Sequence, residues 1–389
     1  MIEMKKIFLL LATALMAAGF TACSDNDDPK GGDSGETTSG IYIINSGNQS
    51  ANIAPSITRY DYLSGATSPA LQDAFQATNG VMIGDGLQQA TICNGKMYIA
   101  MYNSNLIWVV EPSTLKIITR IVPDGDAKTP RFMTSKDGMI YCSMFTGYVC
   151  EIDTKTDKIT RTLKVGPNPE KMAIAGNTLY VACSDGNNYD GAASNGVKYG
   201  NSYIAKVDLK TFTETKVTGL EEAVGAVQAA SLNPTEVVSN GSDVFVVSMG
   251  DYDLKKTKNT VIRISGDKVS KVCDGSMIAI DDNDLYVIYA QYGGGDPTYR
   301  KYDAGTLEEK GSFINQSGNT EAVVEYPGGV NADPVSGDIV VLSYTLSEAG
   351  YAQYKEPCYA NLYSKDGSFK KRIACGVGAI SATFVHTTK

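Results

Sequence analysis

The sequence predicts an all-β fold, a seven-bladed β-propeller that is closed when its C-terminal strand joins the first blade. Two observations predict this architecture. A unit of four short strands, separated by turn residues, recurs along the chain, and the first and last copies of the unit have complementary defects. The clearest copy begins at Val165-Gly166-Pro167, continues through apolar segments at 172–174 and 179–181, and ends at 204–208.

The second half of this unit, a strand followed by a turn, recurs seven times. Successive copies are separated by 38 to 61 residues. A four-stranded blade takes about 40 to 50 residues, so the longer intervals contain inserted loops. An aspartate in an Asp-x-x-Thr turn accepts hydrogen bonds from backbone amides just downstream, and we therefore interpret these aspartates as turn residues and not as catalytic carboxylates. The copies lie at Tyr60-Asp61, Val110-Glu111, Ile152-Asp153, Val207-Asp208, Ile264-Ser265, Tyr302-Asp303 and Leu362-Tyr363.

The two ends of the repeat array complement each other. The first copy lacks an innermost strand, because residues 40–46 already have the pattern of a second strand and only linker precedes them. The last copy is followed by one extra strand at 379–385. If this strand takes the innermost position of the first blade, the ring closes and no free sheet edge remains. The propeller is thus predicted to span residues 40–389.

The first 39 residues are predicted to be export and anchoring segments. Lys5 and Lys6 precede an apolar run at 7–20 that is too short to span roughly 30 Å of hydrocarbon, so residues 1–22 are expected to be a cleaved signal peptide. The sequence Phe20-Thr21-Ala22-Cys23 resembles a bacterial lipobox, which implies lipidation of Cys23. The acidic residues 24–28 resemble the surface-export signal of Bacteroidota lipoproteins or form a plain disordered spacer, and residues 23–39 have the composition of a linker. We expect a lipid-anchored protein of the outer membrane, exposed at the cell surface.

The inserted residues accumulate on one face of the predicted ring. On the opposite face the connections are hairpin turns such as Asn94-Gly95 and Asp137-Gly138. Loops longer than closure requires usually serve function, so we expect the ligand on the elaborated face. The long connections are 45–56, 184–202, 250–259, 290–298 and 344–358 between second and third strands, and 70–86, 218–236 and 312–329 between blades.

These long loops and the shorter turns beside them are rich in tyrosine and asparagine. The chain has 23 tyrosines and one tryptophan. Tyrosine offers a flat stacking surface and a hydroxyl at low entropic cost, which suits a polar ligand with flat faces. The predicted ligand-binding residues are Tyr102, Asn103, Phe145, Asp185, Asn187, Asn188, Tyr189, Tyr199, Tyr252, Tyr292, Tyr351 and Tyr354.

Composition argues against several other functions. The net charge of -9 does not fit a nucleic-acid partner, which requires clustered Lys and Arg. The single histidine, His386, is expected at the surface end of the closing strand, and one histidine almost excludes His-based catalysis and zinc sites. No catalytic residue, metal or cofactor is expected. A carboxylate-based, glycan-active enzyme needs no histidine and stays an alternative, with Asp185, Asp190, Asp251 and Asp253 as its candidate acids.

Seven cysteines accompany Cys23, and four of them are candidates for disulfide bonds. A three-residue hairpin at 145–147 places Cys142 opposite Cys150, and a two-residue turn at Asp366-Gly367 places Cys358 opposite Cys375. An oxidising compartment permits both bonds, but opposed cysteines bond well only at suitable ladder positions. Each pair is therefore either a disulfide or two unbonded thiols.

The repeat unit matches the pattern of the YVTN or YncE-like propeller repeat, and the whole chain resembles the surface propeller lipoproteins of gut Bacteroidota. The best understood of these capture cobalamin and pass it to a TonB-dependent outer-membrane transporter. The resemblance implies binding of a small-molecule nutrient, cobalamin or a related corrinoid, without catalysis. It transfers no binding residue, because no ligand motif is visible. The alternative is a propeller that binds only another protein.

Overall fold

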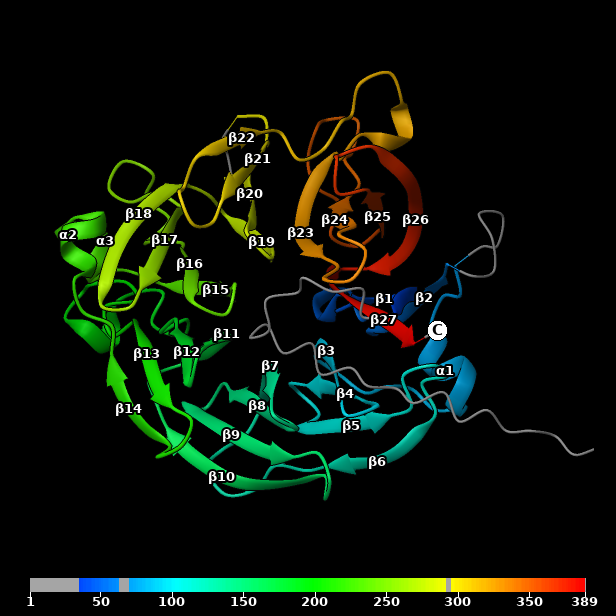
Figure 1. The fold of residues 1–389 in the computed structure, drawn as a ribbon, viewed down its shortest axis with the longest axis horizontal. Helices are drawn as coiled ribbons and strands as arrows, with labels where there is room; N and C mark the ends of the chain where they lie inside the picture. The colour runs from blue at the N-terminus through cyan, green and yellow to red at the C-terminus, as the bar shows by residue number, and fades with distance from the viewer. Residues whose placement is uncertain (1–34, 63–69, 292–294, 389) are drawn as a thin grey trace, which may run out of the picture.

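The computed structural model describes residues 35–62, 70–291 and 295–388 and is a ring of seven antiparallel sheets around a central axis (Figure 1). We number the sheets as blades 1 to 7 in chain order and their strands from the axis outward. The predicted seven-bladed β-propeller is confirmed. Within the described residues, blades 2 to 7 have four strands each, whereas blade 1 has three.

The strands of each blade follow one another in sequence from the axis outward, except in blade 1. Blade 1 consists of β27 (Ala379–Thr388), β1 (Glu36–Asn45) and β2 (Ser56–Asp61). Blade 2 contains β3 (Leu87–Cys93), β4 (Lys96–Met101), β5 (Leu106–Val110) and β6 (Ile117–Ile121). Blade 3 contains β7 (Pro130–Lys136), β8 (Met139–Met144), β9 (Tyr148–Asp153) and β10 (Lys158–Lys164). Blade 4 contains β11 (Pro169–Ala175), β12 (Thr178–Cys183), β13 (Tyr203–Asp208) and β14 (Thr213–Lys216).

The remaining blades repeat this order. Blade 5 contains β15 (Pro234–Ser239), β16 (Asp243–Ser248), β17 (Thr260–Ser265) and β18 (Lys268–Asp274). Blade 6 contains β19 (Met277–Asp281), β20 (Asp284–Tyr289), β21 (Thr298–Asp303) and β22 (Glu309–Gly311). Blade 7 contains β23 (Tyr326–Ala332), β24 (Ile339–Tyr344), β25 (Pro357–Tyr363) and β26 (Phe369–Val377).

The ring is closed by the two ends of the chain, as the sequence predicts. β27 lies beside β1, with register pairs that run from Glu36 opposite Thr388 to Asn45 opposite Ala379 (Figure 1). β1 therefore begins four residues before the predicted start of the propeller at Gly40, because the closing strand pairs with residues 36–38, which the sequence assigns to the linker. All seven blades lie between Glu36 and Thr388.

His386 lies in β27 and is not the surface residue that the sequence suggested. Its side chain is only 9% exposed, and its Nε2 lies 2.7 Å from Oδ1 of the fully buried Asp333, in the turn after β23. Thr38 of β1 donates to the other carboxylate oxygen of Asp333. The prediction for His386 was wrong because blade 7 packs over this end of the closing strand.

The hydrophobic core lies between the blades. The described residues form seven buried clusters, and each cluster joins two neighbouring blades. One cluster, for example, packs Ile44 of β1 against Ile99 of β4. Burial of apolar surface thus fixes each blade relative to the next, and some loop residues, such as Phe75 and Phe313, take part in these clusters.

The connections between strands differ between the two faces of the ring. On the turn face, first and second strands are joined by two-residue turns, such as Asn94-Gly95 and Asp137-Gly138, in which both residues have positive φ. On the loop face lie the connections between second and third strands and those between blades. The short helices lie within connections of these two kinds and are α1 (Ala74–Asn79), α2 (Leu220–Val224), α3 (Ala226–Ala230), η1 (Gln49–Ala51), η2 (Ala192–Ser194) and η3 (Thr320–Ala322). Of these, α1 bonds through Thr78 and Asn79 to the turn between β5 and β6, on the turn face.

Three of the Asp-x-x-Thr turns have the expected hydrogen bonds. Oδ1 of Asp208 accepts bonds from the amides of Lys210 and Thr211, at 2.9 and 2.7 Å. Asp153 and Asp303 have the same kind of contact with downstream amides. These amide bonds, with Lys310, lower the pKa of Asp303 to about 2. The carboxylates at these positions therefore have a structural role.

Candidate ligand-binding site

A cavity of about 690 Å³ opens on the loop face across blades 2, 3 and 4. Its volume lies in the range of roughly 300 to 1,000 Å³ that is typical of small-molecule sites. Six of the residues predicted from the sequence line it together, namely Tyr102, Phe145, Asp185, Asn187, Asn188 and Tyr189. Its other lining residues are Thr129, Thr146, Pro167, Asn168, Asp190, Ala192 and Ala193.

The long loop between β12 and β13 forms one wall of this cavity, and its polar residues hold its shape. Oδ2 of Asp185 accepts hydrogen bonds from Nδ2 of Asn188 at 2.7 Å and from the amide of Asn201 at 2.9 Å. Oδ1 of Asn188 accepts from the amide of Ala193 at 3.0 Å. Asp185 and Asn188 are both buried. They therefore shape the wall, whereas Tyr189, whose side chain is exposed, is available to a ligand.

Two aromatic rings from neighbouring blades meet at the inner side of the cavity. The rings of Tyr102 and Phe145 are in edge contact, with centroids 5.4 Å apart. Beside them lies Arg131, whose Cζ is 4.6 Å from the centroid of Phe145 and 5.6 Å from that of Tyr102. These distances are those of cation–π contacts. The aromatic side of the cavity is thus backed by a positive charge.

Arg131 is paired with an acid from the next blade, Glu170. The guanidinium Nη2 lies 3.0 Å from Oε2 of Glu170, and Ser184 donates a hydrogen bond to Oε1 at 3.3 Å. Burial raises the pKa of Glu170 to about 7, against the lowering effect of Arg131 and of the Ser184 hydrogen bond. The carboxyl group therefore changes its charge near neutral pH.

Sequence reasoning missed both Arg131 and Glu170, although a pattern marks them. In blades 3 and 4 the innermost strand begins with a proline that follows a residue with positive φ, Thr129 or Asn168. The charged residue directly after each proline therefore has the same place in its blade. Blade 5 begins in the same way at Asn233-Pro234 but continues with a threonine. Comparison of these equivalent positions would have found the pair.

The other predicted residues do not join this cavity. Tyr199 and Tyr252 contact each other, with ring centroids 5.9 Å apart, on the loops of blades 4 and 5. Asn103 donates a hydrogen bond to Asp85 at 3.0 Å. Tyr292 lies outside the described residues. The eleven predicted residues that the structure describes thus occupy several separate places on the loop face.

The last two predicted residues, Tyr351 and Tyr354, lie on the loop between β24 and β25 of blade 7. The ring centroid of Tyr354 is 5.0 Å from that of Tyr344 and 6.5 Å from that of Tyr326. Tyr351 and Tyr354 are exposed. These four residues are called the blade 7 tyrosine cluster below.

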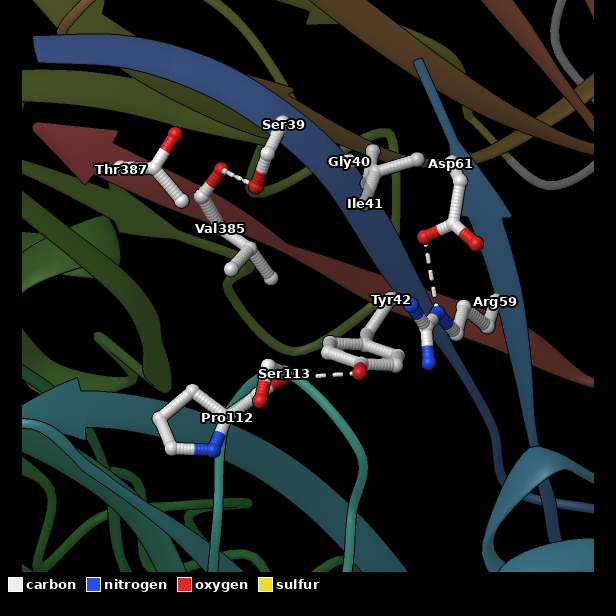
Figure 2. Close-up of a pocket in the computed structure, with 10 residues that line it drawn as sticks. All are labelled: Ser39, Gly40, Ile41, Tyr42, Arg59, Asp61, Pro112, Ser113, Val385 and Thr387. Atoms are coloured by element: carbon white, nitrogen blue, oxygen red, sulfur yellow. Dashed lines mark hydrogen bonds and ion pairs between the residues drawn. The ribbon is translucent and has the colours of Figure 1, made fainter. Parts of the chain in front are cut away.

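A second cavity, of about 460 Å³, lies on the turn face between blades 1 and 2 (Figure 2). Tyr42 points its hydroxyl at the carbonyl of Pro112 and donates to it at 2.8 Å. Arg59 pairs with Asp61 at 2.8 Å (Figure 2). None of the predicted ligand-binding residues lines this cavity. Because these three polar side chains bond to protein groups, we consider this cavity a weaker candidate than the one on the loop face.

The four candidate disulfide cysteines are free thiols in the structure. Cys142 and Cys150 are direct register partners on β8 and β9, as predicted. Cys358 and Cys375 lie on neighbouring strands at a register shift and share one buried cluster. Burial raises the pKa of the thiols of Cys142 and Cys375 well above the usual value. Of the two alternatives, a disulfide or two thiols, the structure thus contains two unbonded thiols in each pair.

The described part of the chain contains no helix of the length and hydropathy that membrane crossing requires. No family model and no curated protein matches the sequence. Among solved structures, the chain is similar to hydrazine synthase of Kuenenia stuttgartiensis, with a TM-score of 0.51, 13% identity, and coverage of 79% of this chain and 89% of that chain. It is also similar to the computationally designed Ika8 protein, with a TM-score of 0.51, 10% identity, and coverage of 89% and 90%. At these identities the likeness concerns the fold alone.

Proposed function

We propose that this propeller is a binding protein without catalytic activity, and that its ligand is a small polar molecule with a flat face. The observation that supports the proposal is the cavity of about 690 Å³ on the loop face, in which Tyr102, Phe145 and Tyr189 gather from three blades. Aromatic faces contribute stacking area, and the side chain of Asn187 makes no hydrogen bond to the described residues that would occupy it.

A corrinoid is the ligand that the resemblance to the surface propeller lipoproteins favours. The test is isothermal titration of a soluble form, residues 24–389, with cyanocobalamin. This form retains the complete ring from Glu36 to Thr388. We expect heat at micromolar protein. If no heat develops at this concentration, cobalamin is not the ligand.

Two tyrosine variants locate the site. Tyr189 is 65% exposed and lines the cavity, whereas Tyr351 is 76% exposed and lies on blade 7. We expect Tyr189→Ala to weaken binding about fivefold, the value of one stacking contact, and Tyr351→Ala to leave the affinity unchanged. Equal effects of both variants would contradict this placement of the site.

We also propose that the chain is anchored by a lipid at Cys23 on the outer membrane and that it passes its ligand to a TonB-dependent transporter. The blade 7 tyrosine cluster is a suitable contact for such a partner, because exposed tyrosines are enriched at protein interfaces. Cys23→Ala should abolish incorporation of labelled fatty acid. Pull-down from outer-membrane extracts should recover the transporter with the wild type and less of it with Tyr351→Ala.

The enzyme alternative, a carboxylate-based glycan hydrolase, has less support. Asp185 is occupied by the hydrogen bonds of its own loop, and Oδ1 of Asp251 accepts from Thr257 and from the amide of Asp253. If a hydrolytic activity is detected, its loss in both Asp185→Asn and Asp251→Asn would revive this alternative.

A further inference from the structure

The guanidinium of Arg131 is incompletely satisfied by the protein. Arginine has five N–H donors in a planar fork that fits two oxygens of one anion. In the described residues Arg131 has one ion-pair partner, Glu170, and its Nε is buried without a hydrogen-bond acceptor. The side chain is 23% exposed, so it is not sealed from solvent. Arg131 can therefore donate a hydrogen bond to a further oxygen atom.

The environment of Glu170, the partner of Arg131, disfavours the charged form of its carboxyl group. Three residues from other elements surround the carboxyl group of Glu170, which lies on β11. They are Arg131 on β7, Ser184 in the loop after β12, and Glu236 on β15. Lys171 is the next residue on β11 and also interacts with it. Of these, Arg131, Ser184 and Lys171 stabilise the carboxylate, and Glu236 opposes it. Tyr252, on the loop after β16, is also close enough to interact with it. Desolvation outweighs the favourable contacts, and the pKa of Glu170 is raised to about 7.

We propose that Arg131 and Glu170 form a proton-coupled anion site, in which an oxyanion group of the ligand replaces the carboxylate of Glu170 at Arg131 while Glu170 takes up a proton from solvent. This inference deepens the proposed function and rests on it, because it assigns an anionic group to the ligand of the adjacent loop-face cavity. Tyr102 and Phe145 connect the anion site with the cavity, since both rings line the cavity and both contact the guanidinium of Arg131. A negatively charged group bound beside these rings would form the bidentate contact that Glu170 does not.

Titration of the soluble form with sodium sulfate tests the site without any assumption about the natural ligand. Sulfate remains a dianion throughout the interval from pH 6 to 8, so its own charge does not change. Sodium acetate in a second arm distinguishes a phosphate-like group from a carboxylate. The protonated fraction of Glu170 falls about tenfold over this range, so the dissociation constant should rise about tenfold. At pH 7, titration in two buffers of different ionisation enthalpy should show uptake of about half a proton per bound anion. Affinity that does not change with pH, or binding without proton uptake, would overturn the proposal.

Variants assign the effect to the two residues. Arg131→Met should abolish anion binding at every pH, and Glu170→Gln should bind at pH 8 as tightly as the wild type does at pH 6. Glu151→Gln is the matched control, because Glu151 pairs with Arg161 on the outer strands of blade 3. It should keep the pH dependence of the wild type. If Glu170→Gln does not fold, the proton uptake of the wild type still decides the question.

The outcomes separate this inference from the proposed function. Sulfate binding with proton uptake, in a protein that gives no heat with cyanocobalamin, would support the anion site and contradict the corrinoid. Cobalamin binding that is independent of pH and unaffected by Arg131→Met would support the function and contradict the anion site.

Discussion

Nε2 of His386 lies 2.7 Å from Oδ1 of Asp333, and this contact ties the last strand of the chain to the seventh blade. Thr38, on the first strand, donates to the same carboxylate. One buried acid therefore joins both ends of the chain to blade 7, at the place where the ring closes. These contacts stabilise the closed ring, so we expect its stability to depend on His386 and on the charge of Asp333.

His386→Asn should destabilise the ring. The substitution removes one partner of a buried carboxylate, and loss of such a partner costs about 1 to 3 kcal/mol. Urea unfolding of the soluble form, followed by circular dichroism, measures the change. Thr387→Ala, next to it on β27, is the control and should have a smaller effect, because its hydroxyl makes only a 3.5 Å contact. Equal stability of the His386→Asn variant and the wild type would contradict a stabilising role of the contact between His386 and Asp333.

Asp333 should make closure sensitive to acid. Its pKa is lowered: although burial raises it, the opposing hydrogen bonds from His386, Ser336 and Thr38 prevail. Since the folded value is below the unfolded value of about 3.9, the unfolded state binds more protons in that interval. The stabilisation is complete above about pH 4 and is lost as the pH falls through the folded value. Asp333→Asn should remove this dependence from the unfolding free energy measured between pH 5 and 3.

Glu170 should have the opposite effect on stability. Its pKa is raised to about 7, so its contribution is greatest below the unfolded value near 4.3 and is lost as the pH rises to 7. The loss over this whole interval is about 4 kcal/mol, because each pKa unit corresponds to about 1.4 kcal/mol. Urea unfolding at pH 5 and pH 8 should show that the wild type loses more stability than Glu170→Gln. If the unfolding free energies of the wild type and the variant changed in parallel with pH, the raised pKa of the Glu170 carboxyl group would be contradicted.

The cysteines should be unreactive in the native protein. Six of the seven described thiols are buried, and burial raises the pKa even of the half-buried Cys273 to about 11. A thiol reagent at pH 8 should therefore modify the folded soluble form slowly, and it should modify all seven cysteines after denaturation. Rapid labelling of Cys142 in the folded protein would contradict its burial.

Mass spectrometry without reduction, on protein prepared under oxidising conditions, will show whether Cys142 and Cys150 form a disulfide, since they oppose each other in register.

Much of the fold could be predicted because its determinants are local. Turn residues such as Asn94-Gly95 and the Asp-x-x-Thr segments mark strand ends wherever they occur, and apolar runs between them mark strands. Closure by residues 379–385 followed from counting strands at the two ends. The first blade was less predictable: within the described residues it has no fourth strand, and an isolated bridge between Arg59 and Leu71 takes that place.

The candidate site was predicted in part. Tyr189 was found because the length and composition of its loop are visible in the sequence, and Tyr102 and Phe145 because their short turns lie on the same predicted face. Asp185 and Asn188 line the same cavity but bond within their own loop, and loop composition does not show such bonds. The lipid anchor, the location, the corrinoid and the transporter stay predictions.

The sequence by itself determined the number of blades, the place of closure and the face that bears the long loops, because strand periodicity and turn chemistry act between near neighbours. Only the tertiary structure decided which loops share a cavity, that Arg131 meets Glu170, and that His386 is enclosed by blade 7. Those contacts join residues from different blades, and the burial that changes the charge state of an acid exists only once the blades have packed against one another.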